Sequence, residues 1–313
     1  MEGSDGAEAL QALRTGGKPA LARALARIEA APEAETTLAL LDAAWSEPHA
    51  HVIGLTGPPG VGKSSLAAAL IRIWRGQGRT VGVIAVDPSS RRSGGALLGD
   101  RTRIDADPED EGVFVRSMAA RDRLGGLADL VPAAMVLMRA VKDVVLIETV
   151  GVGQSETEVS DLADTVLLAV QPGSGDSLQY LKAGIAEIPD VAVVTKADLG
   201  TLASKARQDL RAALRHRAEG EGGWNPPVAL VSAATGAGLE ALDELLSSHR
   251  RHLAGAGRLA ARRRLQAGLW LERLVREEYG RRGLGRVASD LAAVGEPHSP
   301  FRRLARLRPL LGE

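Results

Sequence analysis

Short runs of apolar residues, rich in valine, isoleucine and leucine, recur along the middle of the chain. They are separated by polar or glycine-containing segments, as buried strands are. The runs cover residues 51–56, 80–86, 113–115, 144–147, 165–170, 191–194 and 228–231. Because the runs are continuous rather than alternating, we predict strands that are buried on both faces.

Between these runs, apolar residues recur at helical spacing. The predicted helices cover residues 65–74, 127–139, 178–187, 202–216 and 239–246. Strands that alternate with helices are typical of a parallel sheet covered by helices on both faces. We therefore predict an α/β fold with a doubly wound, mostly parallel sheet over residues 48–248. Residues 91–101 are polar and glycine-rich, which is typical of a functional loop.

Helical patterns flank this domain on both sides. Residues 1–47 predict an extension of two or three short helices, broken around Gly16 and Pro32. Residues 249–313 predict a C-terminal helical arm that is interrupted between Gly280 and Gly285.

The predicted arm has an apolar side and a basic run. We assign Leu265, Leu269, Leu274 and Val275 to one side of a long helix. A twin arm in a homodimer is the simplest cover for such a side, although a structural role without a dimer stays open. We interpret the run from Arg262 to Arg264 as a solvated face of the same helix.

Composition limits the classes of partner. The 313 residues include 39 Lys and Arg against 39 Asp and Glu, so nucleic-acid or membrane-surface binding is unsupported. The absence of cysteine excludes disulfides, thiolate metal sites and a cysteine nucleophile. No apolar run approaches the roughly twenty residues of a membrane span, and the acidic start resembles no targeting segment. We expect a cytoplasmic protein that binds small molecules or proteins.

One stretch carries a complete phosphate-binding motif. Residues 57–64 have the spacing Gly, four residues, Gly-Lys-Ser, between a predicted strand and a predicted helix. In such a P-loop, backbone N–H groups and the helix N-terminus face a phosphate. Lys63 supplies a charge for the β- and γ-phosphates, and the Ser64 hydroxyl is placed to bind Mg²⁺. The candidate phosphate-binding residues are Gly57, Pro58, Pro59, Gly60, Val61, Gly62, Lys63, Ser64 and Ser65.

Polar residues close several predicted strands, and the carboxyl ends of parallel strands border the ligand. Asp87 and Glu148 are candidate Mg²⁺ ligands, directly or through water. Asp198 is placed to accept hydrogen bonds from the guanine N1–H and N2–H₂, which adenine lacks. A single acid at a strand end is more often a helix cap or a turn residue, but several beside a P-loop are not explained by capping. Residues that we expect to border the base are Thr195, Lys196, Ser232, Ala233 and Ala234.

The stretch from Glu148 to Gly151 has the form of a switch loop: an acid, two residues and a glycine. In such a loop the amide of Gly151 can sense the γ-phosphate and release it on hydrolysis. We therefore predict that this segment responds to the nucleotide state.

Several longer motifs resemble the MeaB/ArgK family of P-loop GTPases, which are chaperones of adenosylcobalamin-dependent methylmalonyl-CoA mutase. The similarity covers nearly the whole chain. The motifs that carry it are residues 86–90, 93–95, 98–103, 116–118, 124–127, 148–156 and 172–176.

This resemblance implies a Mg²⁺-dependent GTPase that binds GTP and GDP. It also implies a homodimer with an N-terminal helical extension (1–47), a GTPase domain (48–248) and a dimerisation arm (249–313). Family members bind the mutase, gate cofactor loading and protect the mutase from inactivation, and the mutase stimulates their GTP hydrolysis. The same properties are expected of this chain.

The resemblance also implies roles for single residues. Asp100 is expected in the mobile switch, on the Mg²⁺ side, with Lys63 and Glu148 in the catalytic set. Gln154 is either a water-positioning residue or a structural one, because it lies three residues after Gly151. No clear general base is present, which fits slow intrinsic turnover.

One departure from the family concerns the base pocket. Thr195 stands where the family usually has Asn. Its shorter side chain without an amide predicts a weaker buttress of the base pocket and weaker guanine selectivity, with Asp198 carrying most of that selectivity.

Two other functions fit the sequence less well, a metal-delivery GTPase and a small-molecule kinase. A metal-delivery GTPase needs clustered Cys or a His-rich tract, and the six histidines are scattered along the sequence. A small-molecule kinase would use a P-loop and an arginine-rich lid, but an adenine pocket has no use for the carboxylate of Asp198.

Overall fold

The computed structural model describes residues 2–88, 107–120, 130–149, 158–173, 188–214, 223–292 and 299–312. Contacts divide the chain into two compact units. The helical unit comprises Met1–Ala50, Asp129–Lys142 and Ala260–Glu313, and the sheet unit comprises His51–Ala128 and Asp143–Leu259.

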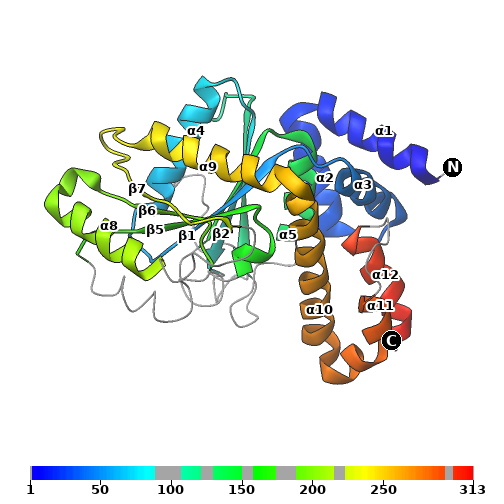
Figure 1. The fold of residues 1–313 in the computed structure, drawn as a ribbon. Coiled ribbons are helices and arrows are strands. Elements are labelled where there is room, and N and C mark those ends of the chain that lie inside the picture. The colour runs from blue at the N-terminus through cyan, green and yellow to red at the C-terminus, as the bar shows by residue number, and fades with distance from the viewer. Residues whose placement is uncertain are drawn as a thin grey trace. The chain divides into compact units, whose positions relative to one another are not determined.

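The sheet unit is built on a parallel sheet, which has seven strands within the described residues (Figure 1). The strands pair in the order β3-β2-β4-β1-β5-β6-β7. This topology confirms the predicted α/β fold with a parallel sheet. The strands are β1 (His51–Thr56), β2 (Val81–Pro88), β3 (Val113–Ala120), β4 (Val144–Glu148), β5 (Thr165–Val170), β6 (Val191–Val194) and β7 (Val228–Leu230).

Helices cover both faces of this sheet. Among the described residues, the α-helices of the sheet unit include α4 (Lys63–Gly76), α8 (Thr201–Leu214) and α9 (Leu239–Ala254). Leu167 and Val193 belong to a core that includes residues of α4 and α9, whereas their neighbours Leu168 and Val194 pack with α8. Since successive side chains of a strand point to opposite faces, α4 and α9 lie on one face and α8 on the other (Figure 1).

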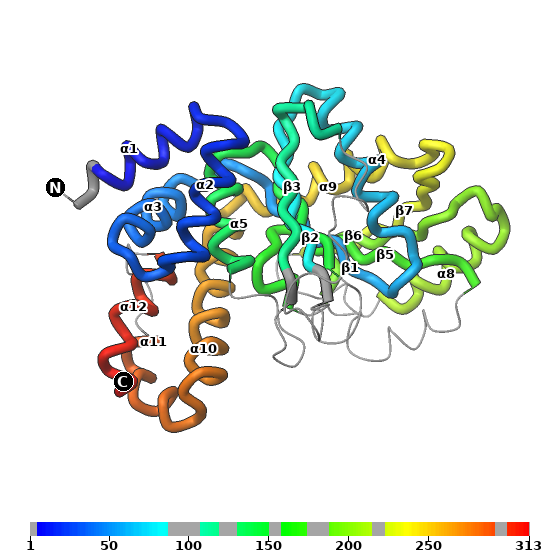
Figure 2. Tube along the Cα trace, turned by 180° about the vertical axis from the view of Figure 1, so that it is seen from behind, coloured from blue at the N-terminus to red at the C-terminus, as the bar shows by residue number. Residues whose placement is uncertain are grey.

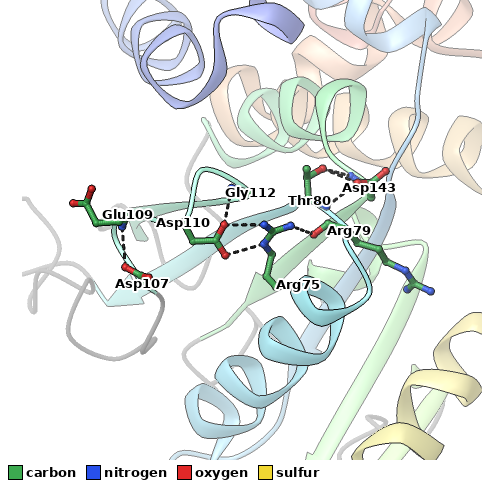
Figure 3. Close-up of polar contacts among 8 residues, drawn as sticks. All are labelled: Arg75, Arg79, Thr80, Asp107, Glu109, Asp110, Gly112 and Asp143. Carbon is green, nitrogen blue, oxygen red and sulfur yellow. Dashed lines mark hydrogen bonds and ion pairs between the residues drawn. The ribbon is translucent and has the colours of Figure 1, made fainter.

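A cluster of polar contacts lies where the strands β2 and β3 begin (Figure 3). The Arg75 guanidinium, in the last turn of α4, donates to both carboxylate oxygens of Asp110 at 2.8 Å. These hydrogen bonds raise the pKa of Arg75. Nearby, the backbone N–H and the hydroxyl of Thr80 donate to Asp143 at 2.7 and 2.8 Å. The pair of Arg75 and Asp110 joins the C-terminal end of α4 to the segment that precedes β3.

The helical unit gathers segments from both ends of the chain (Figure 2). Most of α10 belongs to it. Its helices are α1 (Glu2–Thr15), α2 (Gly17–Ala30), α3 (Glu35–Ser46), α5 (Val131–Val141), α10 (Arg258–Arg286), α11 (Ala288–Ala292) and α12 (Pro300–Leu311).

The long helix α10 differs from its predicted pattern in two ways. Leu274 and Val275 are buried against residues of α12 in the same chain, but Leu265 and Leu269 are 62% and 45% exposed, so the four do not share a side. The run from Arg262 to Arg264 is also not a wholly solvated face. Arg263 is buried and donates to the carbonyl of Ala50 at 3.0 Å.

Most predicted elements agree with the structure. The strands at 51–56, 165–170 and 191–194 have the predicted bounds, and α10 is interrupted at Gly280, whose φ is 64°. The strand predicted at 113–115 extends to Ala120, because its backbone continues to pair with β2 beyond the apolar run, starting with the polar Arg116 and Ser117. The helix predicted at 178–187 lies outside the described residues.

No helix in the described parts of the chain combines the length and the apolar character needed to cross a membrane.

Candidate functional site

The P-loop connects the end of β1 at Thr56 to the start of α4 at Lys63. Gly57 has a φ of 140°, and a Cβ there would lie 2.1 Å from the carbonyl oxygen of Ala169 on β5. Gly62, directly before the helix, has a φ of 95°. Both positions therefore require glycine: the first because of close backbone approach, the second because of its left-handed conformation.

Lys63 and Ser64 point to different partners at the start of α4. The Lys63 ammonium donates to the carbonyl oxygens of Gly57 and Pro58 at 2.8 and 3.0 Å, so its charge lies against the loop. The Ser64 hydroxyl donates to a carboxylate oxygen of Glu148 at 2.6 Å. Glu148 is buried, and it closes β4, the strand next to β1.

The oxygens of Ser64 and Glu148 fit a Mg²⁺ ion, which binds hard oxygen ligands beside substrate phosphates. Ala85 of β2 pairs with Glu148, so the backbone of Asp87 lies two residues further along the neighbouring strand. The Asp87 side chain is not among the described ones. Asp100, Gly151 and Gln154 also lie outside the described residues.

Thr195 reaches the P-loop despite its short side chain. Its hydroxyl lies 2.8 Å from the carbonyl oxygen of Val61 and 3.1 Å from that of Val170, and the residue is buried. A hydroxyl has one proton, so it donates to one carbonyl at a time. The residue expected to be a weak buttress therefore links the P-loop to the end of β6.

Asp198 is held by the segment after β7. The buried Ser232 donates its hydroxyl proton to Asp198 at 2.6 Å. That bond, the backbone N–H of Asp198 and the nearby Lys196 hold the pKa of Asp198 below its usual range. Ala233 is half-buried and Ala234 is exposed next to this contact. The structure thus brings together the predicted base reader and the predicted border of the base.

Three residues that make polar contacts near the site are not among those predicted from the sequence: Gln171, Thr56 and Thr149. Gln171, directly after β5, accepts a hydrogen bond from the Lys196 ammonium at 2.6 Å. The rule that polar residues close strands would have found it. Thr56 and Thr149 also share a hydrogen bond. The same rule would have found Thr56, which ends the predicted strand at 51–56.

Histidines that are scattered along the sequence lie close together where β1 and β5 begin, at the opposite end of these strands from the P-loop. The hydroxyl of Thr165 lies 2.6 Å from Nε2 of His51 and 2.7 Å from Nδ1 of His249. Trp224 packs against His249 and His252 with tilted rings, at centroid distances of 4.8 and 5.2 Å. Burial together with Arg258 lowers the pKa of His252. Within the residues that the structure describes, no group of three or more His, Asp or Glu side chains is arranged to hold a metal ion.

The P-loop, Glu148, Thr195, Asp198 and Ser232 all lie in the sheet unit. A family model described as "Methylmalonyl Co-A mutase-associated GTPase MeaB" matches residues 21–286. The chain belongs to the MeaB family of GTPases. The resemblance drawn from the motifs is therefore confirmed.

Individual relatives of this MeaB family member agree with the assignment. It is 45% identical over 218 residues to a putative GTPase of Pyrococcus horikoshii, a match that covers 69% of each chain. It is 38% identical over 232 residues to the mouse (Mus musculus) protein named methylmalonic aciduria type A homolog, mitochondrial, covering 72% of this chain and 55% of that protein.

A solved structure extends the likeness to the whole chain. The crystal structure of LAO/AO transport system kinase matches with a TM-score of 0.69 and 27% identity, over 99% of this chain and 98% of that chain. The MeaB family member described here is a GTPase, which binds and hydrolyses GTP.

Proposed function

We propose that this GTPase is a nucleotide-dependent chaperone of an adenosylcobalamin-dependent acyl-CoA mutase. It gates cofactor loading and protects the mutase, which in turn stimulates GTP hydrolysis. The observation that carries the proposal is the match over residues 21–286 to a family described by its association with methylmalonyl-CoA mutase. The contacts around the P-loop support the nucleotide-binding half of the proposal.

Within this proposal, the P-loop and the two strand ends beside it hold the phosphates. Lys63 turns its ammonium from the loop carbonyls to the β- and γ-phosphates, and the backbone amides of 57–65 surround them. Ser64, Asp87 and Glu148, with Asp100, hold Mg²⁺, which neutralises charge that develops on the phosphates. Supporting this arrangement, Ser64 and Glu148 are in direct contact.

The base is read on the other side of the P-loop. Asp198 accepts from guanine, Thr195 and Lys196 fix the reading segment, and Ser232 to Ala234 border the base. The hydrogen bond from Ser232 keeps the carboxylate of Asp198 oriented and ionised. Hydrogen bonds to a charged acceptor are stronger than those to a neutral one. Because guanine offers two donors to Asp198 and adenine lacks this pair, the site favours GTP over ATP.

The switch segments connect the nucleotide to the partner. Glu148 begins one of them, and its carboxylate touches Ser64 of the P-loop. If the mutase binds the GTP and GDP states with different affinity, reciprocity requires it to change nucleotide affinity in turn. Ordering of the switch segments by the mutase would also speed hydrolysis, as activators of other GTPases do by about 10³ to 10⁵.

The test measures both directions of this coupling. GTP turnover is followed with and without the mutase, and adenosylcobalamin loading of the mutase is followed with GTP, GDP or neither. We expect the mutase to raise turnover and loading to depend on the nucleotide. Lys63→Ala is the control: it should abolish tight nucleotide binding and leave the fold intact. If turnover and loading are each indifferent to the other component, the chaperone function is wrong.

We further propose that the chain forms a homodimer through its C-terminal arm. Leu265 and Leu269 lie one turn apart on α10, and both are exposed in the single chain. Light scattering on a sizing column should give twice the monomer mass for the wild type and the monomer mass for Leu265→Glu/Leu269→Glu. A monomeric wild type contradicts this assignment.

A further inference from the structure

Thr56 and Thr149 lie side by side at the point where β1 and β4 end. The two strands are parallel neighbours, and the last pair in their register is Leu55 with Glu148. Thr56 is the last residue of β1, and Thr149 directly follows β4. The N–H of Thr149 donates to the carbonyl of Leu55 at 3.1 Å. Both threonines are 1% exposed.

Their hydroxyls join the two strand ends. Thr149 Oγ1 donates to Thr56 Oγ1 at 3.2 Å, and the carbonyl oxygen of Leu55 lies 3.5 Å from the same hydroxyl. Leu55 belongs to the core that includes α4, so the threonine side chains, one residue further on, face the opposite side of the sheet. The bond therefore adds a side-chain link where the regular backbone pairing stops.

The hydrogen bond between the two threonines connects the residue before the P-loop to the residue after Glu148. Thr56 directly precedes Gly57, the first residue of the P-loop, and Thr149 directly follows Glu148. Glu148 points to the α4 side and accepts the hydrogen bond of Ser64 at 2.6 Å. Moving the end of β4 relative to the end of β1 would therefore move the Glu148 carboxylate relative to Ser64.

We propose that Thr56 and Thr149 form a positioning pair, which holds Glu148 at Ser64 and so sets how much Mg²⁺ strengthens nucleotide binding. The pair itself touches neither the metal nor the nucleotide. This inference rests on the proposed Mg²⁺ roles of Ser64 and Glu148.

A purely structural role for the pair predicts a different pattern. Thr149→Val removes one hydroxyl and leaves that of Thr56 buried without its partner, which destabilises the fold. Thr56→Val/Thr149→Val removes both hydroxyls at nearly constant shape, so stability should return toward that of the wild type. A positioning defect should persist in this double variant, because the link between the strand ends is still missing.

The experiment measures the affinity of a fluorescent non-hydrolysable GTP analogue with Mg²⁺ and with EDTA, beside the thermal midpoint of the nucleotide-free protein. For Thr149→Val we expect the gain in affinity from Mg²⁺ to fall by about three- to tenfold, the usual range for one buried hydrogen bond. Affinity in EDTA should not change. Thr149→Ser keeps the hydroxyl and should keep the gain. The matched control is Thr37→Val, which removes an equally buried hydroxyl from α3 in the helical unit.

The double variant decides between the two roles. A recovered thermal midpoint with a persistently reduced Mg²⁺ gain supports positioning. Recovery of both together, or an unchanged gain in Thr149→Val, overturns the inference and leaves the proposed Mg²⁺ roles intact. A wild type whose affinity does not respond to Mg²⁺ overturns those roles as well, so the two failures are distinguishable.

Discussion

Ser64, Thr195 and Ser232 each place a hydroxyl against a group that the nucleotide site needs. Their partners are the Glu148 carboxylate at 2.6 Å, the Val61 carbonyl at 2.8 Å and the Asp198 carboxylate at 2.6 Å. Hydroxyls can rotate between donor directions, so each can hold a loop without fixing it permanently. At the residue scale, neutral hydroxyls therefore hold two carboxylates and one carbonyl of the P-loop in place.

Asp198→Asn should lower the affinity for GTP and narrow the preference for guanine over other purine nucleotides. Hydrogen bonds to a charged acceptor contribute about 1.5–3 kcal/mol each, so a loss of tenfold or more is expected. Because the pKa of Asp198 lies below its usual range, the wild-type preference should stay constant from about pH 5 to 8. Titrations with GTP, ATP and inosine triphosphate test this, and an unchanged preference in the variant would show that the base is read elsewhere.

Thr195→Val keeps the shape of the side chain but removes its hydroxyl. We expect a loss of about 1 kcal/mol in the free energy of unfolding and weaker GTP binding, because the Val61 carbonyl loses its partner. Thr195→Asn is the matched variant: it restores a donor, so it should bind GTP at least as well as the wild type. Denaturant unfolding and nucleotide titration measure both effects, and wild-type values for Thr195→Val would contradict the link.

At the scale of elements, α4 is held at both of its ends. Its first residue, Lys63, donates hydrogen bonds to carbonyl oxygens of the P-loop. In its last turn, Arg75 binds Asp110 (Figure 3). The guanidinium lies flat on Gly112, where a Cβ would be 2.1 Å from the guanidinium carbon. The amide of Gly112 also donates to Asp110 at 2.9 Å. Glycine at this position therefore allows the ion pair to form.

Gly112→Ala should displace Arg75 and lose the bidentate pair, which costs about 1–3 kcal/mol in the free energy of unfolding. Arg75→Ala should cost a similar amount. Because both changes remove the same interaction, the double variant should be no less stable than the less stable single variant. Denaturant unfolding of the four proteins completes this cycle, and simple additivity would show that Gly112 and Arg75 act independently.

At the scale of the whole molecule, the C-terminal helix α12 packs against α3 and α10 of the same chain within the helical unit. Arg302 of α12 donates to both oxygens of Glu35 on α3 at 3.1 and 2.7 Å and also binds Asp42. The apolar side of α12 covers Val275 of α10 through Leu307 and Leu311. The C-terminal helix therefore needs no second copy to bury that side of the arm.

Arg302→Ala should destabilise the helical unit by about 2 kcal/mol, because two carboxylates lose a partly buried partner. GTP turnover at temperatures below unfolding should stay at the wild-type level, since the described residues of the candidate site lie in the sheet unit. Thermal unfolding and a phosphate-release assay measure the two effects. Arg264→Ala, which removes an exposed arginine of α10, is the control. A turnover defect without a loss of stability would mean that the helical unit acts on catalysis.

Local sequence determined the elements and the chemistry they carry. Continuous apolar runs such as 165–170 and 191–194 predict buried strands, because a strand covered on both faces tolerates few polar side chains. The P-loop spacing is equally local, since its glycines must adopt conformations that other residues resist. These patterns depend only on residues that are close along the chain, so the strands and the P-loop can be predicted without knowing the fold.

Only the tertiary structure decided which of these elements meet. The strand order β3-β2-β4-β1-β5-β6-β7 places Thr149 beside Thr56, 93 positions apart in the sequence, and Thr195 beside Val61, 134 positions apart. Helical periodicity likewise did not show that α12 covers Leu274 and Val275 while Leu265 stays exposed. Periodicity reports which side of an element is apolar, but the partner that buries it depends on contacts between segments distant in the sequence.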